Sequence, residues 1–202
     1  SHVKIQCFRA EHFPEWAQAE KRKVEFPRAR LGEFARLAHA YGLAAGASVF
    51  DAEAVELCAR ELDFLKLAAR EASNHTLIYK TLKAAQATRK PVYRSVPFCV
   101  GRGLVSAWPD LKIVTLHARP QYPTPMLTAI LELWLFSRYA KKYEIEWGHS
   151  SHSRSDLDCV LAAHLGASVI EKHFALAADD PEARHSLLPA QFKRMVDRCQ
   201  TH

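Results

Sequence analysis

The sequence has no hydrophobic run long enough to cross a bilayer, because the longest apolar stretch, Met126 to Phe136, is short and contains Glu132. It has no internal repeat and no low-complexity segment. No G-x-G-x-x-G motif or P-loop follows any predicted strand, which argues against a nucleotide-binding open sheet. Ser1-His2 leads straight into an apolar segment, so no signal peptide is expected. We therefore expect a cytoplasmic protein with no membrane partner.

Paired cysteines are also missing. The five cysteines are odd in number and form no C-x-x-C pair, which is typical of reduced thiols in the cytoplasm. They are equally compatible with a role as small buried apolar side chains. Zinc-finger spacing and RNA-binding signatures are absent, and the 28 basic residues, against 22 acidic ones, are scattered. The net charge of +6 therefore favours small phosphates and carboxylates over nucleic acid as partners.

Short β-rich runs alternate with helical patterns, which is typical of parallel βαβ units. The connection 97–110 is broken by prolines and glycines, so no regular crossover helix is expected there. We predict an α/β protein forming a single domain over 1–202. It would be a TIM-type (β/α) barrel, shortened because the first strand–helix unit is absent and one crossover helix is degenerate. A doubly wound open sheet is the competing architecture. The expected strands are 3–8, 43–49, 64–69, 91–96, 111–118, 143–150 and 167–174, and the expected helices are 29–41, 51–62, 75–88, 125–140, 155–165 and 189–199.

Several residues mark the ends of these elements. Asp51 stands where the N-cap of helix 51–62 is expected. Gly42 and Gly166 precede strands and fit the C′ position that ends a helix. Pro123 and Pro125 predict a rigid strand-to-helix turn, with Pro125 at the first helical position.

Two lysines, Lys4 and Lys66, stand near the centres of predicted strands. Lysine is seldom buried without a partner, and strands of a parallel barrel are covered on both faces. If both side chains point inward, they need an anion between them. Alternatively, each pairs with a carboxylate of the barrel, such as Glu71, Glu144 or Glu146, and the residues alone do not separate the two interpretations.

Histidines and hydroxyls follow other strands. His152 and His173 come at the ends of two successive predicted strands, which places both at the rim where barrel active sites are built. Two imidazoles with open positions suit a catalytic divalent ion, although eleven histidines make a chance pairing easy. Hydroxyls at other strand ends are weak candidates for phosphate contacts, and Tyr122 either faces a ligand or packs beneath its turn. The hydroxyls are those of Ser48, Ser95 and Ser150.

Taken together, several segments resemble the N-acetylneuraminate (sialic acid) synthase family, NeuB, which includes the legionaminate and pseudaminate synthases. YPTP at 122–125 and EKHF at 171–174 are the most specific. The resemblance covers nearly the whole chain, in the order of the family. The other segments are VKIQCFRAE at 3–11, ASVFDAEAVELC at 47–58, FLKLAAREASN at 64–74, KPVYRS at 90–95, GHSSH at 148–152, LGASVIEKHF at 165–174 and SLLPAQFKRMV at 186–196.

The resemblance implies a reaction in which C3 of phosphoenolpyruvate adds to the aldehyde of an N-acetylated amino sugar and phosphate is released. It implies a divalent metal, manganese with magnesium or cobalt as alternatives, held by His152 and His173. It implies that phosphoenolpyruvate contacts Lys4, Ser48, Lys66, Ser95 and Ser150, and that Glu71, Asn74 and Tyr122 line the sugar side, Glu71 and Tyr122 with catalytic roles.

The chain also departs from the family pattern. Ala69, Pro120 and Ser151 stand where the family usually has serine, asparagine and aspartate, and Glu182 is a candidate for an acidic residue that contacts the sugar. A C-terminal antifreeze-like domain is not expected in this chain. Each lost contact to a charged group costs about 1.5–3 kcal/mol. Three interpretations follow: an active synthase, an impaired relative that still binds metal or phosphoenolpyruvate, or a structural or interaction module.

A barrel with a missing strand exposes a strand edge, and exposed edges pair with other chains. We expect a partner subunit, and hence a homo-oligomer, or the segment Glu11–Lys23 to cover that edge.

Overall fold

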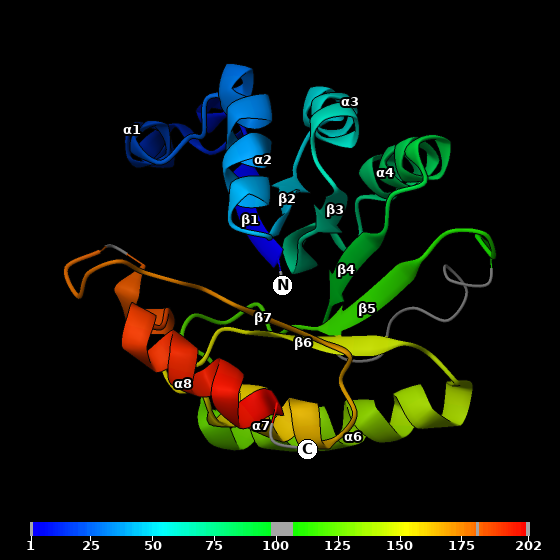
Figure 1. Cartoon of the computed structure of the whole chain (residues 1–202), viewed down its shortest axis with the longest axis vertical. Coiled ribbons are helices and arrows are strands. Elements are labelled where there is room, and N and C mark those ends of the chain that lie inside the picture. The colour runs from blue at the N-terminus through cyan, green and yellow to red at the C-terminus, as the bar shows by residue number, and fades with distance from the viewer. Residues whose placement is uncertain (1, 98–106, 181, 201–202) are drawn as a thin grey trace. The chain divides into compact units, whose positions relative to one another are not determined.

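The computed structural model describes residues 2–97, 107–180 and 182–200 (Figure 1). Within these residues, seven strands form a sheet whose order follows the chain. The strands are β1 (His2–Cys7), β2 (Ala44–Val49), β3 (Phe64–Leu67), β4 (Val92–Val96), β5 (Ile113–His117), β6 (Trp147–Ser151) and β7 (Val169–Lys172). The α-helices are α1 (Glu15–Lys23), α2 (Leu31–Ala40), α3 (Ala52–Glu61), α4 (His75–Thr88), α6 (Met126–Tyr143), α7 (Leu157–His164) and α8 (Pro189–Gln200).

The expected alternation of strands and helices is confirmed, with two local differences. The expected strand 143–150 begins only at Trp147, because α6 continues to Tyr143 and ends where Glu144 adopts a left-handed φ of 53°. Helix α1 was not expected, because none of its residues is buried and the segment lacks an apolar stripe. Most of the connection 97–110, expected to be irregular, lies outside the described residues. None of the described helices combines the length and the apolar character that a membrane span needs.

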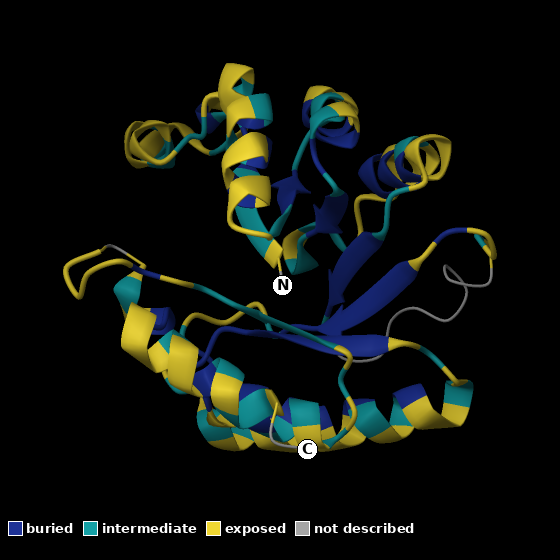
Figure 2. Cartoon of the chain, viewed as in Figure 1, coloured by how far each residue is buried: buried dark blue, intermediate teal, exposed yellow. Residues whose placement is uncertain are grey.

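The chain divides into two compact units. The first comprises Ser1–Arg94 and Trp108–Ile113. Strands β1, β2, β3 and the first part of β4, up to Arg94, pair in parallel in this unit, and α2, α3 and α4 pack side by side along them. Strands β2, β3 and β4 are almost entirely buried, β1 is mostly of intermediate exposure, and the helices keep exposed outer faces (Figure 2). The register sets Gln6 opposite Ser48, Ser48 opposite Lys66, and Lys66 opposite Tyr93. Polar side chains of neighbouring strands therefore lie next to one another.

The second unit comprises Ser95–Ala107 and Val114–His202. Strands β5, β6 and β7 pair in parallel, and α7 packs against both α6 and α8 (Figure 1). A core of fully or almost fully buried side chains joins these helices to the strands, and burial of this apolar surface is the main stabilising term. It consists of Val96, Leu133, Phe136, Ala140, Trp147 and Ala162.

The expected element ends are largely confirmed. The Asp51 carboxylate accepts a hydrogen bond of 2.8 Å from the Ala54 amide and caps α3. Gly42 and Gly166 have φ values of 68° and 92°, the left-handed conformation in which a Cβ is strained. Pro125 is the N-cap of α6 and not its first residue, because its ψ of 135° is extended and the helix begins at Met126.

Four of the five cysteines, Cys7, Cys58, Cys159 and Cys199, are free thiols, and Cys99 lies outside the described residues. The first three are completely buried, so their packing as small apolar residues is also borne out.

Candidate functional site

Three of the predicted phosphoenolpyruvate contacts come together in the first unit. The Lys4 ammonium on β1 donates a hydrogen bond of 3.1 Å to the Ser48 hydroxyl on β2, and Ser48 lies opposite Lys66 of β3. Ser48 and Lys66 are each only 3% exposed. Two ammonium groups on the strands that flank one hydroxyl are groups of the kind that bind phosphate and carboxylate oxygens.

Two of the three carboxylates considered as alternative partners for these lysines, Glu71 and Glu146, form hydrogen bonds with other residues. Glu71 accepts hydrogen bonds of 3.1 Å from Arg70 Nε and 2.9 Å from Asn74 Nδ2. Glu146 accepts one of 3.1 Å from the Ser168 hydroxyl. Glu71 and Glu146 are therefore both engaged with other side chains.

Asn74 has a structural function as well as the predicted one toward a sugar. It is the N-cap of α4, and its Oδ1 accepts a hydrogen bond of 3.1 Å from the Leu77 amide. Its Nδ2 meanwhile holds Glu71. The two residues assigned to the sugar side in this part of the chain are therefore fixed to each other and to the start of a helix.

Replacing Asn74 by alanine is expected to lower the free energy of unfolding by about 1 kcal/mol, because an N-cap acceptor is lost. Asn74→Ser, which keeps an acceptor, should cost only a few tenths of that. Urea unfolding followed by circular dichroism measures both. Equal stability of Asn74→Ala and the natural chain would contradict the capping role.

The other two predicted phosphate contacts lie in the second unit. Ser95 on β4 is 1% exposed, and Ser150 on β6 is 4% exposed and stands opposite Glu171 of β7. Both residues are therefore buried on strands of the parallel sheet.

The two histidines predicted to bind a metal are close together. His152 directly follows β6, His173 directly follows β7, and their ring centroids are 5.5 Å apart. The ring of Tyr122 packs on His152 at 4.0 Å and lies 6.2 Å from His173. The structure thus brings together three of the predicted site residues, and Tyr122 remains 48% exposed at the edge of the group.

Backbone contacts fix the orientation of His152. Its Nδ1 donates a hydrogen bond of 2.7 Å to the carbonyl of Arg119, and its own carbonyl accepts one of 2.9 Å from the Thr124 amide. A histidine whose Nδ1 carries the proton presents the lone pair of Nε2 to a cation. The proline-containing turn before α6 therefore positions this imidazole.

A third histidine, which the sequence analysis did not single out, joins His173. His185 ends the short 3-10 helix Ala183–His185, and its ring centroid is 4.7 Å from that of His173 and 5.2 Å from that of Tyr122. The Leu187 amide donates to the His173 carbonyl at 2.9 Å, which holds the two segments together. The E-x-x-H spacing of Glu182 and His185 is the sequence signal that could have pointed to it.

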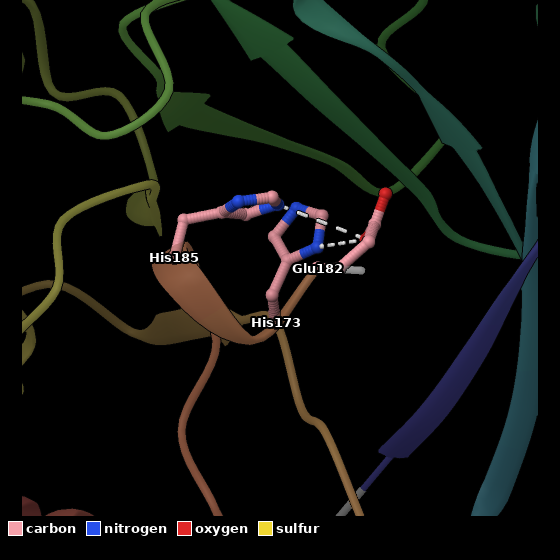
Figure 3. Close-up of side chains that lie close together, drawn as sticks. All are labelled: His173, Glu182 and His185. Atoms are coloured by element: carbon pink, nitrogen blue, oxygen red, sulfur yellow. Dashed lines mark hydrogen bonds and ion pairs between the residues drawn. The ribbon is translucent and has the colours of Figure 1, made fainter. Parts of the chain in front are cut away.

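Both imidazoles face the carboxylate of Glu182, as Figure 3 shows. His173 Nδ1 lies 3.0 Å and His185 Nε2 lies 3.7 Å from Glu182 Oε2. Ligand atoms of these three residues all lie within 4.8 Å of one another. Burial, and then the charge of His173, lower the pKa of His185, so this ring is neutral at physiological pH. The donor set of imidazoles and one carboxylate is one that transition-metal ions prefer.

A buried polar network lies beside this group, and the sequence did not reveal it. Asp158 of α7 accepts hydrogen bonds of 2.8 Å from both Ser151 and Ser153 and lies 3.0 Å from His149 Nε2. Lys172 donates to Ser151 at 2.9 Å. Burial by itself would raise the pKa of Asp158. The hydrogen bond from His149 and the positive charges of His149 and Lys172 have the larger, opposite effect, and they lower this pKa to about 2. The network connects the strands that carry His152 and His173.

Comparison with known proteins places these observations in a family. Over 95 residues the chain is 39% identical to the pseudaminic acid synthase of Campylobacter jejuni (serotype O:2), a match that covers 44% of this chain and 25% of that protein. It is 31% identical over 144 residues to an uncharacterized protein of Methanocaldococcus jannaschii, covering 64% of this chain and 40% of the relative. These matches thus span less than half the length of both curated relatives.

A solved structure shares the fold. The N-acetylneuraminic acid synthetase of Leptospira borgpetersenii, crystallised with citrate, superposes with a TM-score of 0.85 at 22% identity. The superposition covers 98% of this chain and 71% of that one. The family model described as NeuB matches residues 2–202. The predicted resemblance is thereby confirmed, and the chain belongs to the NeuB family.

Proposed function

We propose that this chain is the shortened (β/α) barrel of a nonulosonate synthase, a transferase that condenses phosphoenolpyruvate with an N-acetylated amino sugar. In this reaction a C–C bond forms between C3 of phosphoenolpyruvate and the aldehyde carbon, the C–O bond to phosphate breaks, and water supplies the oxygen left on C2. The gathering of His152, His173 and Tyr122 at the ends of β6 and β7 carries the proposal, because family membership alone does not require a site to persist.

The anionic substrate would be bound by the cationic part of the site. Lys4 and Lys66 would neutralise the phosphate and carboxylate of phosphoenolpyruvate, with Ser48 oriented by its hydrogen bond to Lys4. The hydroxyls of Ser95 and Ser150 would complete the contacts to oxygen atoms.

His152 and His173 would hold the divalent cation, Mn²⁺ in this proposal, which as a Lewis acid polarises the aldehyde oxygen of the sugar. The tautomer set by the Arg119 carbonyl fits this role, since it directs the proton of His152 away from Nε2. Glu71 and Asn74 would bind sugar hydroxyls, and the exposed ring of Tyr122 would border the sugar.

The impaired-relative interpretation has one observation in its favour. Ser151 stands where the family usually has aspartate, and its hydroxyl is already used by Asp158 and Lys172. The contact that the aspartate makes in the family is therefore not reproduced by Ser151. Under this interpretation the chain would bind phosphoenolpyruvate and the cation without turning them over. We propose in either case that it is a cytoplasmic homo-oligomer.

Phosphate release is the test. With phosphoenolpyruvate, Mn²⁺ and N-acetylmannosamine or an N-acetylated diamino hexose, the chain should release phosphate only when both substrates are present. Lys66→Met should raise KM for phosphoenolpyruvate by about tenfold or more, because a charged contact worth about 1.5–3 kcal/mol is lost. Lys193→Met, at an exposed lysine of α8, is the matched control.

The other interpretations predict different results. Calorimetric binding of phosphoenolpyruvate and Mn²⁺ without phosphate release from any sugar would replace the synthase with the impaired relative. Absence of both binding and turnover would leave only a structural or interaction module.

A further inference from the structure

We propose that His185 and Glu182 are further ligands of the cation that His173 binds. The inference rests on the proposed function in placing a cation beside His173, and it adds an imidazole and a carboxylate that neither the motifs nor the comparisons assign. The first argument is geometric. Ligand atoms bound to one transition-metal ion at about 2.0–2.2 Å lie at most about 4.4 Å apart. The observed separations of up to 4.8 Å need only small rotations of the side chains.

The second argument is the burial of His185. Its side chain is 7% exposed, and Nδ1 has no hydrogen-bond partner among the described residues. A buried imidazole without its full set of partners is destabilising, so such groups in a folded protein commonly serve a ligand. The other nitrogen, Nε2, faces Glu182 at 3.7 Å, which is long for a hydrogen bond. A cation bound by Nε2 would replace this long contact and so compensate in part for the burial of the ring.

The third argument is charge. Glu182 is half exposed, and both imidazoles point toward its carboxylate, 3.0 Å and 3.7 Å from Oε2 (Figure 3). One carboxylate with neutral imidazoles leaves a divalent ion with a net positive charge, which retains its power as a Lewis acid. An added imidazole also favours Co²⁺ and Zn²⁺ over Mg²⁺. The proposed set of ligands therefore predicts tighter binding of Co²⁺ and Zn²⁺ than of Mg²⁺.

Isothermal titration calorimetry with Mn²⁺ and Co²⁺ in the absence of substrates tests the inference. His185→Phe removes both nitrogens and keeps a ring, and Glu182→Gln removes the charge at a half-exposed position where folding is not at risk. Each variant should bind the cation about 10–100-fold more weakly, with the larger loss for Co²⁺ in His185→Phe. The visible absorption of bound Co²⁺ should also change, because a nitrogen ligand is lost.

His39→Gln is the matched control. His39 and Asp63 form a histidine–carboxylate pair at 2.7 Å in the first unit, outside the proposed set of ligands, so the loss of His39 should leave cation affinity unchanged. Circular dichroism confirms that each variant is folded. His152→Ala completes the set, because His152 belongs to the proposed synthase site but not to the added ligands.

The outcomes separate the two proposals. Weakened binding in His152→Ala but natural affinity in both His185→Phe and Glu182→Gln would overturn the inference and leave the proposed function intact. Weakened binding in His185→Phe and Glu182→Gln, together with no phosphate release from any sugar, would support the inference while the synthase proposal fails. A natural chain that binds neither cation would overturn the inference, and phosphate release would then decide the function by itself.

Discussion

Asp158→Asn is expected to lower the free energy of unfolding by about 3–5 kcal/mol at pH 7, because it removes one member of a buried charged network. Asp158 is fully buried and is held by His149, Ser151 and Ser153. Asparagine has nearly the same shape, but it lacks the charge and replaces one acceptor with a donor. Lys172, whose pKa burial lowers, then remains in the interior with less compensating charge.

The same carboxylate gives this prediction a pH dependence. The pKa of Asp158 is lowered to about 2 in the folded protein from 3.8 in the unfolded chain. The stabilisation that arises from this difference is complete above pH 3.8 and disappears as the pH falls through 2, and it amounts to about 2 kcal/mol. The difference in stability between the natural chain and Asp158→Asn should therefore narrow between pH 4 and pH 2.

Urea unfolding at several pH values measures both effects. Asp197→Asn is the control, because Asp197 pairs with Lys193 at 2.6 Å on the exposed face of α8 and such pairs contribute about 0–1 kcal/mol. A loss in Asp158→Asn no larger than in Asp197→Asn would show that the network does not stabilise the fold.

Gly148→Ala is expected to lower the free energy of unfolding by about 3 kcal/mol, since it overpacks the contact between two strands. A Cβ at Gly148 of β6 would lie 2.4 Å from the Val169 carbonyl oxygen and 2.5 Å from Leu116 Cδ2. The carbonyl belongs to the backbone of β7 and cannot rotate away, so the strands must separate. Because His152 and His173 follow these two strands, cation affinity should fall as well.

A glycine-to-alanine substitution at an open position should not lower the free energy of unfolding. Gly32 lies in α2, where a Cβ would approach only the ends of two flexible side chains, at 3.1 and 3.6 Å. Gly32→Ala should therefore leave the stability unchanged or raise it by up to about 1 kcal/mol, because alanine loses less backbone entropy in a helix. Thermal unfolding compares the two variants, and a Gly148→Ala midpoint equal to that of the natural chain would refute the packing argument.

Local patterns predicted the elements well where burial is periodic. The stripe of α3 with its Asp51 cap, and the glycines at 42 and 166, mark boundaries that the structure confirms. The exposed helix α1 was missed because it has no buried face and thus no periodic signal. The start of β6 was misplaced because Tyr143 and Ile145 fit the pattern of a strand, although Tyr143 ends α6 and Ile145 lies between α6 and β6.

The chemistry of the site was predictable where a residue type is unusual for its place. Lysines within strands and histidines after strands stand out from the sequence alone, and the resemblance to the family joins them to one reaction. His185 did not stand out, because a histidine in an irregular segment has no expected environment. Its proximity to His173 depends on the bridge between Phe174 and Leu187, a contact between separate segments.

The sequence by itself therefore determined the alternation of strands and helices, the family and the residue types at the strand ends, because these depend on neighbours along the chain. Only the tertiary structure decided that Glu182 and His185 join His173, and that Asp158 links the strands beneath them. Such contacts bring together side chains from different elements, and their distances are fixed by packing and register rather than by local preference.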